Sequence, residues 1–116
     1  MNISKDLMAA SATPLVLAIL AEGDSYGYAI IKRVKDLSDG HLQWTDGMLY
    51  PVLHRLERLD FIKARWGKSE TGRKRKYYRL TSSGKVQLGE HRQQWHAADQ
   101  ALRIVWKFGG QDPVAG

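Results

Sequence analysis

The first half of the chain places apolar residues at helical spacing in three segments. The first lies between Thr13-Pro14, a pair typical of a helix N-cap and first turn, and Glu22-Gly23, which is typical of a helix end. This pattern predicts a short, mostly buried helix that begins at Thr13. Its apolar positions are Leu15, Ala18 and Ile19.

The second and third segments have the same period. Ser25 is the predicted N-cap of a second helix that ends at Ser38-Asp39-Gly40, and Thr45 is the predicted N-cap of a third. Pro51 lacks an amide donor, so we expect the third helix to begin with an irregular turn. The predicted buried faces are Tyr28, Ile31, Val34 and Leu37 in the second helix, and Leu49, Val52, Leu53, Leu56 and Leu59 in the third.

After the third helix the period changes to two. Alternating residues from Phe61 to Trp66 and from Lys74 to Leu80 predict two strands, and the loop around Gly72 predicts an antiparallel hairpin. Tyr78 and Leu80 are expected to face the core, and Tyr77 to pack on the second or last helix. Two tryptophans are predicted to lie in the core, Trp44 and Trp66.

A long helix is predicted from Ser82 to about Lys107, with Thr81 and Ser82 as caps. Its apolar positions advance by four and three residues, as in a coiled-coil seam. The helix would be about 39 Å long at ~1.5 Å per residue, longer than the preceding domain, so its seam needs another surface. The seam positions are Leu88, His91, Trp95, Ala98, Leu102 and Val105, with Trp106 beside their end.

The expected fold class is mostly α with a small β-hairpin (α+β). Three helices followed by a hairpin is the order of a winged helix-turn-helix, in which the third helix enters the major groove and the hairpin reaches the neighbouring backbone or minor groove. We expect a DNA-binding domain with an N-terminal helix over residues 1–81, a dimerisation helix over 82–108 and a disordered tail over 109–116.

Charge is concentrated in the predicted hairpin. The chain has a net charge of +6, and the stretch from Lys63 to Arg79 holds eight basic residues and one acidic residue. A concentration of positive charge of this kind is typical of proteins that bind polyanions, because binding releases the counterions condensed on the polyanion. Double-stranded DNA is therefore the expected partner, and a solvated charged face is the alternative.

Other classes of protein fit the sequence poorly. The absence of cysteine excludes disulfides, thiolate zinc sites and thiol nucleophiles. The uncharged stretch 7–21 is shorter than the ~20 residues of a membrane-spanning helix, and Asp6 and Glu22 flank it unlike a secretory signal. We expect a cytoplasmic protein without membrane contact.

Three motifs together resemble the PadR family of bacterial transcriptional regulators. They are YGY at 26–28 with IIKR at 30–33, GMLYPVLHRLE at 47–57, and RKRKYYRLT at 73–81 with Gly84 following. The resemblance covers about Leu15 to Trp106. It implies a winged-helix domain, a C-terminal dimerisation helix and repression relieved by a small molecule.

Two residues depart from the family pattern. Met48 stands where Thr or Ser is common, which removes a possible hydroxyl contact to phosphate. Asp60 stands where a Gly usually ends the third helix, but Asp tolerates the left-handed conformation better than most residues, so the turn can be kept.

The resemblance places Tyr50 and His54 towards DNA, and their spacing of four puts them on one helix face. Arg55 and Arg58 can bind phosphate or instead pair with Glu57 and Asp60. The expected DNA-binding residues are Thr45, Tyr50, His54, Arg55 and Arg58 on the helix and Lys68, Arg73, Lys74 and Arg75 on the wing.

The last helix carries the expected dimer and effector contacts. Trp95 is predicted to lie in the dimer interface, and paired with its symmetry mate it can line a flat pocket for a small aromatic effector, as in some PadR-like proteins. The expected interface residues are Leu88, Trp95, Ala98, Leu102 and Trp106.

No enzyme, metal site or cofactor is predicted. The chain lacks HExxH, Walker and GxSxG patterns, and His91 and His96 are five residues apart, so on a helix they point in different directions. Two alternatives to a DNA-binding regulator remain open at this point: a winged-helix adaptor that binds proteins, and an effector-binding protein without DNA affinity.

Overall fold

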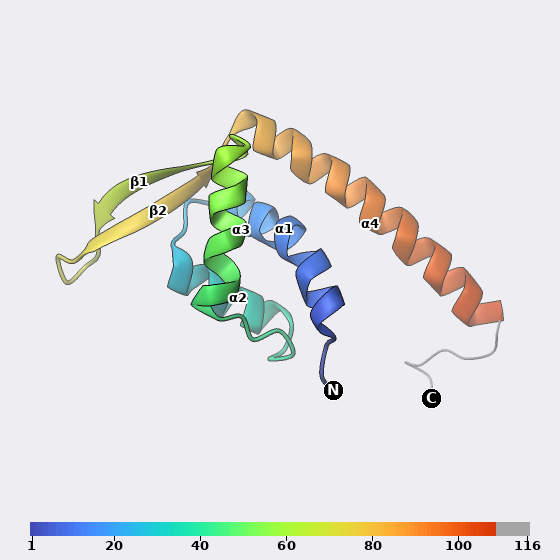
Figure 1. Cartoon of the computed structure of the whole chain (residues 1–116). Helices are drawn as coiled ribbons and strands as arrows, with labels where there is room; N and C mark the ends of the chain where they lie inside the picture. Colours follow the sequence, from blue (N-terminus) through green and yellow to red (C-terminus); the bar gives the residue numbers. More distant parts are fainter. Residues whose placement is uncertain (109–116) are drawn as a thin grey trace.

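The computed structural model describes residues 1–108, so the tail predicted for 109–116 lies outside the described residues. Figure 1 shows the helices and the hairpin in the predicted order, which confirms the mostly α fold class with one antiparallel hairpin. The elements are α1 (Lys5–Glu22), α2 (Gly27–Leu37), α3 (Asp46–Arg58), β1 (Ile62–Lys68), β2 (Lys74–Leu80) and α4 (Ser82–Phe108).

One core joins the first three helices to the base of the hairpin and the start of α4. Ile62 of β1 and Tyr78 of β2 are almost fully buried in it, and Leu88 is the α4 residue that reaches it. Trp44 is also buried, as predicted. The helical residues of the core are Ala12, Val16, Leu17, Ile19, Leu20, Ile30, Val34, Leu49, Leu53 and Leu56.

The predicted start of the first helix is wrong. Helix α1 begins at Lys5, eight residues before Thr13, and the Ser4 hydroxyl accepts a hydrogen bond from the Leu7 amide at 3.2 Å. Pro14 therefore lies inside the helix, where it removes one backbone donor. Burial of the apolar residues on both sides of the proline offsets that loss.

The predicted N-cap of α2 is wrong, and its predicted buried face is right only for Val34 and half-buried Ile31. Ser25 pairs with Tyr78 as an isolated β-bridge, with N–O distances of 3.1 and 2.7 Å, so Tyr26 takes the N-cap position. The helix buries Ile30 and Val34, whereas the predicted core residues Tyr28 and Leu37 are exposed. Both faces have helical period, so the periodicity alone does not choose between them.

Helix α3 follows most of the prediction. The Thr45 hydroxyl caps it by accepting from the Met48 amide at 3.3 Å, and the helix continues through Pro51 without the expected irregular turn. Leu59 is exposed at the C-cap, not buried as predicted. Asp60 follows with a φ of 61°, which confirms that Asp adopts the left-handed turn in place of the family's Gly.

The hairpin pairs Ile62 with Leu80 at its base and Lys68 with Lys74 at its tip. Its seven-residue strands are about 23 Å long, so the outer half extends beyond the core. Trp66 lies in that half and is 68% exposed, which corrects its assignment to the core.

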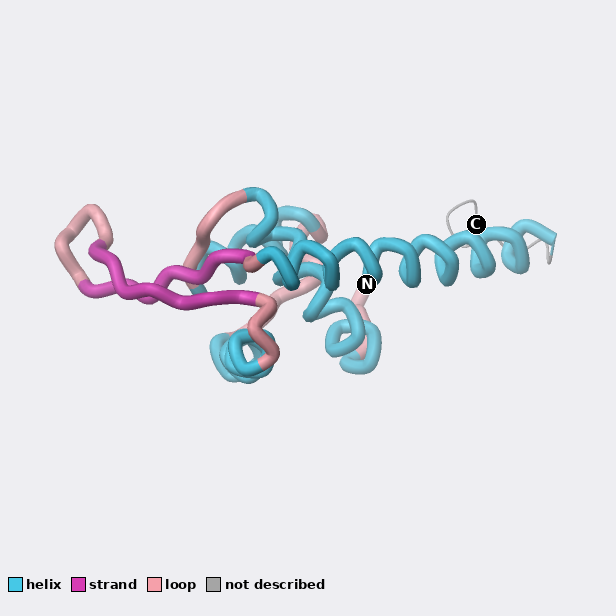
Figure 2. Tube along the Cα trace, turned by 90° about the horizontal axis from the view of Figure 1, so that it is seen from above, coloured by secondary structure: helices cyan, strands magenta, loops and turns pink. Residues whose placement is uncertain are grey.

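Helix α4 leaves the domain on the side opposite the hairpin, as Figures 1 and 2 show. At its start the Thr81 hydroxyl accepts from the Gly84 amide at 3.0 Å, and Thr81 and Ser83 both donate to the Asp60 carbonyl. From residue 89 to residue 107 the side chains are exposed except for half-buried His91. Within residues 1–108, no helix is long and apolar enough to cross a bilayer.

Candidate nucleic-acid interface

Three predicted DNA-contacting side chains form an exposed face on α3. Tyr50, His54 and Arg58 recur every four residues on the side opposite the buried leucines, and the rings of Tyr50 and His54 are 6.2 Å apart. Arg58 makes no hydrogen bond or ion pair with any residue in 1–108. This face therefore presents an aromatic phenol, an imidazole and a guanidinium to solvent.

Arg55 and Thr45 lie away from this face. The Arg55 guanidinium donates to the Thr13 hydroxyl of α1 at 2.7 Å, and Thr45 is occupied as the N-cap. Glu57, which the sequence left as a possible partner for the arginines, instead lies 3.9 Å from Lys76 of β2. The structure thus brings together three of the five predicted α3 residues.

Tyr50 is held against the start of α2. A Cβ atom at Gly27 would lie 2.5 Å from the Tyr50 hydroxyl oxygen and 3.1 Å from its Cζ. Only glycine leaves room for the phenol ring in this position, so Gly27 helps to fix the direction in which Tyr50 points.

The wing residues predicted to bind phosphate lie at the hairpin tip. Lys68 and Lys74 are directly opposite each other across the strands, an unfavourable pairing of like charges in the absence of an anion. Arg73 follows Gly72 in the loop, and its amide donates to the Ser69 hydroxyl at 3.3 Å. The tip therefore concentrates positive charge at the point most accessible to a partner.

Arg75 is held by aromatic rings. Its guanidinium lies 3.8 Å from the centroid of Tyr26, which in turn packs edge-on against Tyr77 at 5.7 Å. Tyr77 thus packs at the N-cap of α2, one of its two predicted positions. Arg65 covers Tyr77 at 4.9 Å and lies 3.5 Å from an Asp24 carboxylate oxygen. These contacts tie the hairpin to the α1–α2 turn.

An open groove lies where the hairpin, the start of α2 and the exposed face of α3 meet. It has a volume of about 450 Å³, and its lining contains no acidic residue. We call it the aromatic–cationic groove; its lining residues are Tyr26, Gly27, Tyr28, Tyr50, Trp66, Lys74, Arg75 and Lys76. The sequence prediction missed Tyr26, Tyr28 and Trp66 because it assigned all three to packing. For Trp66 the available signal was that the strands are longer than the core can cover.

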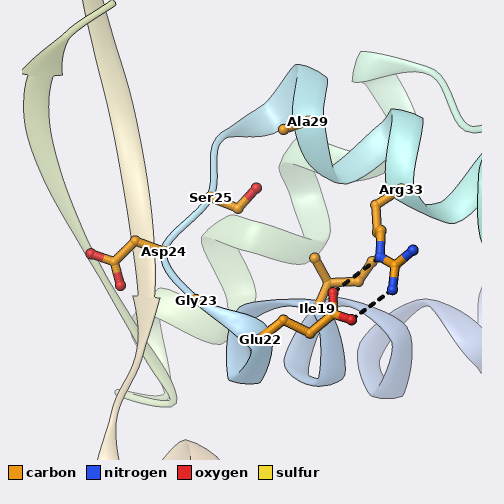
Figure 3. A pocket seen from close by; sticks show the side chains of 7 residues that line it. All are labelled: Ile19, Glu22, Gly23, Asp24, Ser25, Ala29 and Arg33. Carbon is orange, nitrogen blue, oxygen red and sulfur yellow. Dashed lines mark hydrogen bonds and ion pairs between the residues drawn. The ribbon is translucent and has the colours of Figure 1, made fainter.

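A second pocket, of about 230 Å³, lies between the α1–α2 turn and α2 (Figure 3). Figure 3 shows Glu22 and Arg33 joined by two hydrogen bonds, of 3.1 and 2.7 Å. The hydrogen bond from Arg33 lowers the pKa of Glu22. Asp24, on the same pocket wall, faces Arg65. Because these charges are already paired, this pocket is a weaker candidate site than the groove.

Tyr78 lies beneath the interface with its hydroxyl buried and without a hydrogen-bond partner in residues 1–108. Burial raises its pKa to about 12. The folded state therefore retains a proton that the unfolded chain loses near pH 10. The contribution of this proton to the free energy of unfolding is fully present at neutral pH and is lost as the pH rises from about 10 to 12.

Tyr78→Phe is expected to remove this alkaline loss. By pH 12 the wild type should have lost about 2 kcal/mol of unfolding free energy relative to the variant, while at pH 7 the two should differ by no more than ~1 kcal/mol. Urea denaturation at several pH values measures the difference. Tyr28→Phe, at an exposed tyrosine, is the control, and parallel pH profiles of the wild type and Tyr78→Phe would contradict the expectation.

The predicted interface residues of α4 divide into two groups. Leu88 belongs to the core of its own domain, whereas Trp95, Leu102 and Trp106 are 38%, 47% and 43% exposed. Ala98 is exposed between them, and with Gln94 and Trp95 it lines a shallow pocket of about 250 Å³. In the part of the chain that is described, no group of three His, Asp or Glu side chains is arranged to hold a metal ion.

Comparisons with known proteins agree with this geometry. Residues 16–90 match the transcriptional regulator PadR-like family. Protein X of Lysinibacillus sphaericus, which is uncharacterised, is 34% identical over 102 residues, covering 88% of this chain and 94% of that protein. The chain also resembles solved structures of a transcriptional regulator from Clostridium thermocellum (TM-score 0.79, 31% identity, 88% and 96% of the two chains) and a PadR family transcription regulator from Clostridium difficile (TM-score 0.72, 31% identity, 82% and 97%). The chain belongs to the PadR-like family of transcriptional regulators.

Proposed function

We propose that this regulator binds a pseudo-palindromic DNA operator as a homodimer. The observation that carries the proposal is the exposed face of α3, where Tyr50, His54 and Arg58 project beside a basic hairpin. A helix of this kind fits the major groove, and its polar side chains can read the edges of the bases. Lys68, Arg73 and Lys74 then bind phosphates at the wing tip.

The second half of α4 supplies the dimer contact in this proposal. Within residues 1–107 its apolar side chains are exposed, and their heptad spacing fits a second helix of the same kind. Two domains joined in this way place their α3 helices in successive major grooves, about 34 Å apart.

We further propose that the protein represses transcription and is released by a small aromatic effector. Trp95 offers a flat, partly exposed ring beside Ala98, at the middle of the proposed interface. An effector that binds between two such rings and changes the angle between the helices lowers operator affinity, provided that it binds the DNA-free state more tightly.

Fluorescence anisotropy with the intergenic DNA beside the protein's own gene tests the proposal. We expect binding at least ~10³-fold tighter than to unrelated DNA at the same salt concentration. Equal affinity for both DNAs would contradict sequence-specific binding. Effector release is tested separately, by adding small aromatic compounds to the complex and following Trp fluorescence and anisotropy together.

A matched pair of arginines on α3 tests which face meets DNA. Arg58→Ala should weaken operator binding by about tenfold or more, since a good base or phosphate contact is worth ~1–3 kcal/mol. Arg55→Ala removes the same charge from the side that faces α1 and should change affinity much less. Equal losses in the two variants would show that the assigned face is not the one that contacts DNA.

A further inference from the structure

We propose that the aromatic–cationic groove is a specific binding site, here called the seat, for one sugar–phosphate unit of the operator. In this site Trp66 packs on the deoxyribose, and Lys74 and Arg75 contact the phosphate. The inference rests on the proposed function and adds aromatic contacts to those already proposed for the α3 face and the wing tip. It assigns a ligand contact to Trp66, Tyr26 and Tyr28.

The path of the DNA strand carries the first step. If α3 occupies a major groove and the hairpin reaches the adjacent minor groove, the strand that separates those two grooves must pass between α3 and the hairpin. The aromatic–cationic groove occupies that position, because Tyr50 of α3 forms one wall and Trp66 and Lys74 of the hairpin form another. Figure 1 shows the hairpin projecting from the domain beside α3.

The charges of the lining favour a phosphodiester. Lys74 has no ion-pair partner within residues 1–108 and faces Lys68 across the hairpin, so an anion placed there relieves the repulsion between two like charges. The guanidinium of Arg75 is already oriented by the Tyr26 ring, so little side-chain freedom remains to be lost on binding. No carboxylate in the lining competes for these cations.

The aromatic residues fit the sugar. Trp66 is 68% exposed and Tyr28 is 71% exposed. Other residues of the same elements, Ile62 in β1 and Ile30 in α2, are fully buried in the core. Large apolar surfaces exposed in a concave site are typical of binding contacts. The C–H groups of deoxyribose can cover an indole face and remove that apolar surface from water, whatever the base sequence.

The groove keeps its width without DNA because its walls are connected. Lys76 reaches Glu57 on α3, Arg75 stacks on Tyr26, and Arg65 meets Asp24 in the α1–α2 turn. Each contact is weak alone at an exposed site, but the three act on the same short hairpin. The hairpin is thus held at a defined angle to α3.

Two variants and one control test the seat by salt titration of operator binding. Trp66→Ala should weaken binding by about tenfold with an unchanged salt slope, since it removes apolar contact and no charge. Lys74→Gln should reduce the slope of log affinity against log salt by about 0.9, the value for one phosphate contact. Lys63→Gln, which removes the same charge near the base of the hairpin and outside the lining of the groove, should leave the slope close to that of the wild type.

Single methylphosphonate linkages placed along the operator locate the contact. One neutral linkage in each half-site should weaken the wild type and have no further effect on Lys74→Gln. The seat is rejected if Trp66→Ala binds like the wild type, or if Lys74→Gln and Lys63→Gln have the same slope. A wild type that does not discriminate operator from unrelated DNA rejects the proposed function and the seat together, so the two failures are distinguishable.

Discussion

Gly84→Ala is expected to lower the free energy of unfolding by about 3 kcal/mol, because the added methyl group has no space at the joint between hairpin and α4. A Cβ atom at Gly84 would collide with the Phe61 carbonyl oxygen and lie 2.7 Å from Leu80 Cδ1. The Phe61 carbonyl also accepts from the Thr81 amide at 3.0 Å, so it cannot move without loosening the joint.

The neighbouring Gly89 provides the control. It lies in the same helix with nothing within 4 Å of its missing Cβ, so Gly89→Ala should stabilise the protein by about 0.5–1 kcal/mol through helix propensity. Urea denaturation followed by circular dichroism, at one protein concentration for all variants, gives both values. A Gly84→Ala variant as stable as the wild type would show that the joint relaxes easily.

Trp95→Glu combined with Leu102→Glu is expected to convert the proposed dimer into monomers. The two residues are one heptad apart on the exposed apolar seam, and placing carboxylates there buries charge and adds repulsion across a two-fold axis. Operator affinity should fall by about a hundredfold or more, since each domain then binds without the effective concentration that its partner provides.

Gln93→Glu combined with Gln100→Glu is the matched control for the seam. These residues are also one heptad apart and exposed, but they lie on the opposite side of α4. This double variant adds the same two carboxylates to α4 but outside the seam, so it should leave the protein dimeric. Sedimentation equilibrium measures the mass, and a Trp95→Glu/Leu102→Glu protein that remains dimeric would place the interface elsewhere.

Local signals predicted most of the architecture. Thr45 and Thr81 act as caps as predicted, because each has a short hydroxyl side chain immediately before a periodic apolar segment. The alternation around Tyr78 gave the correct hairpin, since residues two apart share a face. Features that depend on neighbours within a few residues were therefore accessible from the sequence.

The errors arose where distant segments decide the outcome. Ser25 has the chemistry of an N-cap but pairs with Tyr78, more than fifty residues later, so Tyr26 takes the N-cap position. Thr13-Pro14 has the form of a helix start, but core packing of α1 extends the helix through it. Trp66 alternates correctly and yet lies beyond the end of the core. In each case tertiary contact overrides a valid local preference.

The candidate site was predicted only in part for a related reason. Helical spacing predicts that Tyr50, His54 and Arg58 are exposed, the family resemblance implies that Tyr50 and His54 face DNA, and the wing cations follow from charge density. The positions of Arg55 and Arg75 depend on contacts with Thr13 and Tyr26, which are far from them in sequence. A single sequence gives no direct indication of such pairs.

The joint at Gly84 gives α4 the properties of a rigid arm. From this joint to residue 108 the helix extends about 36 Å, so a rotation of only ~10° displaces its far end by about 6 Å. That displacement approaches the axial rise of two base pairs, at ~3.4 Å each. In the proposed dimer, a rotation of about 10° where the helices meet would therefore put the two α3 helices out of phase with the operator, without any change inside either DNA-binding domain.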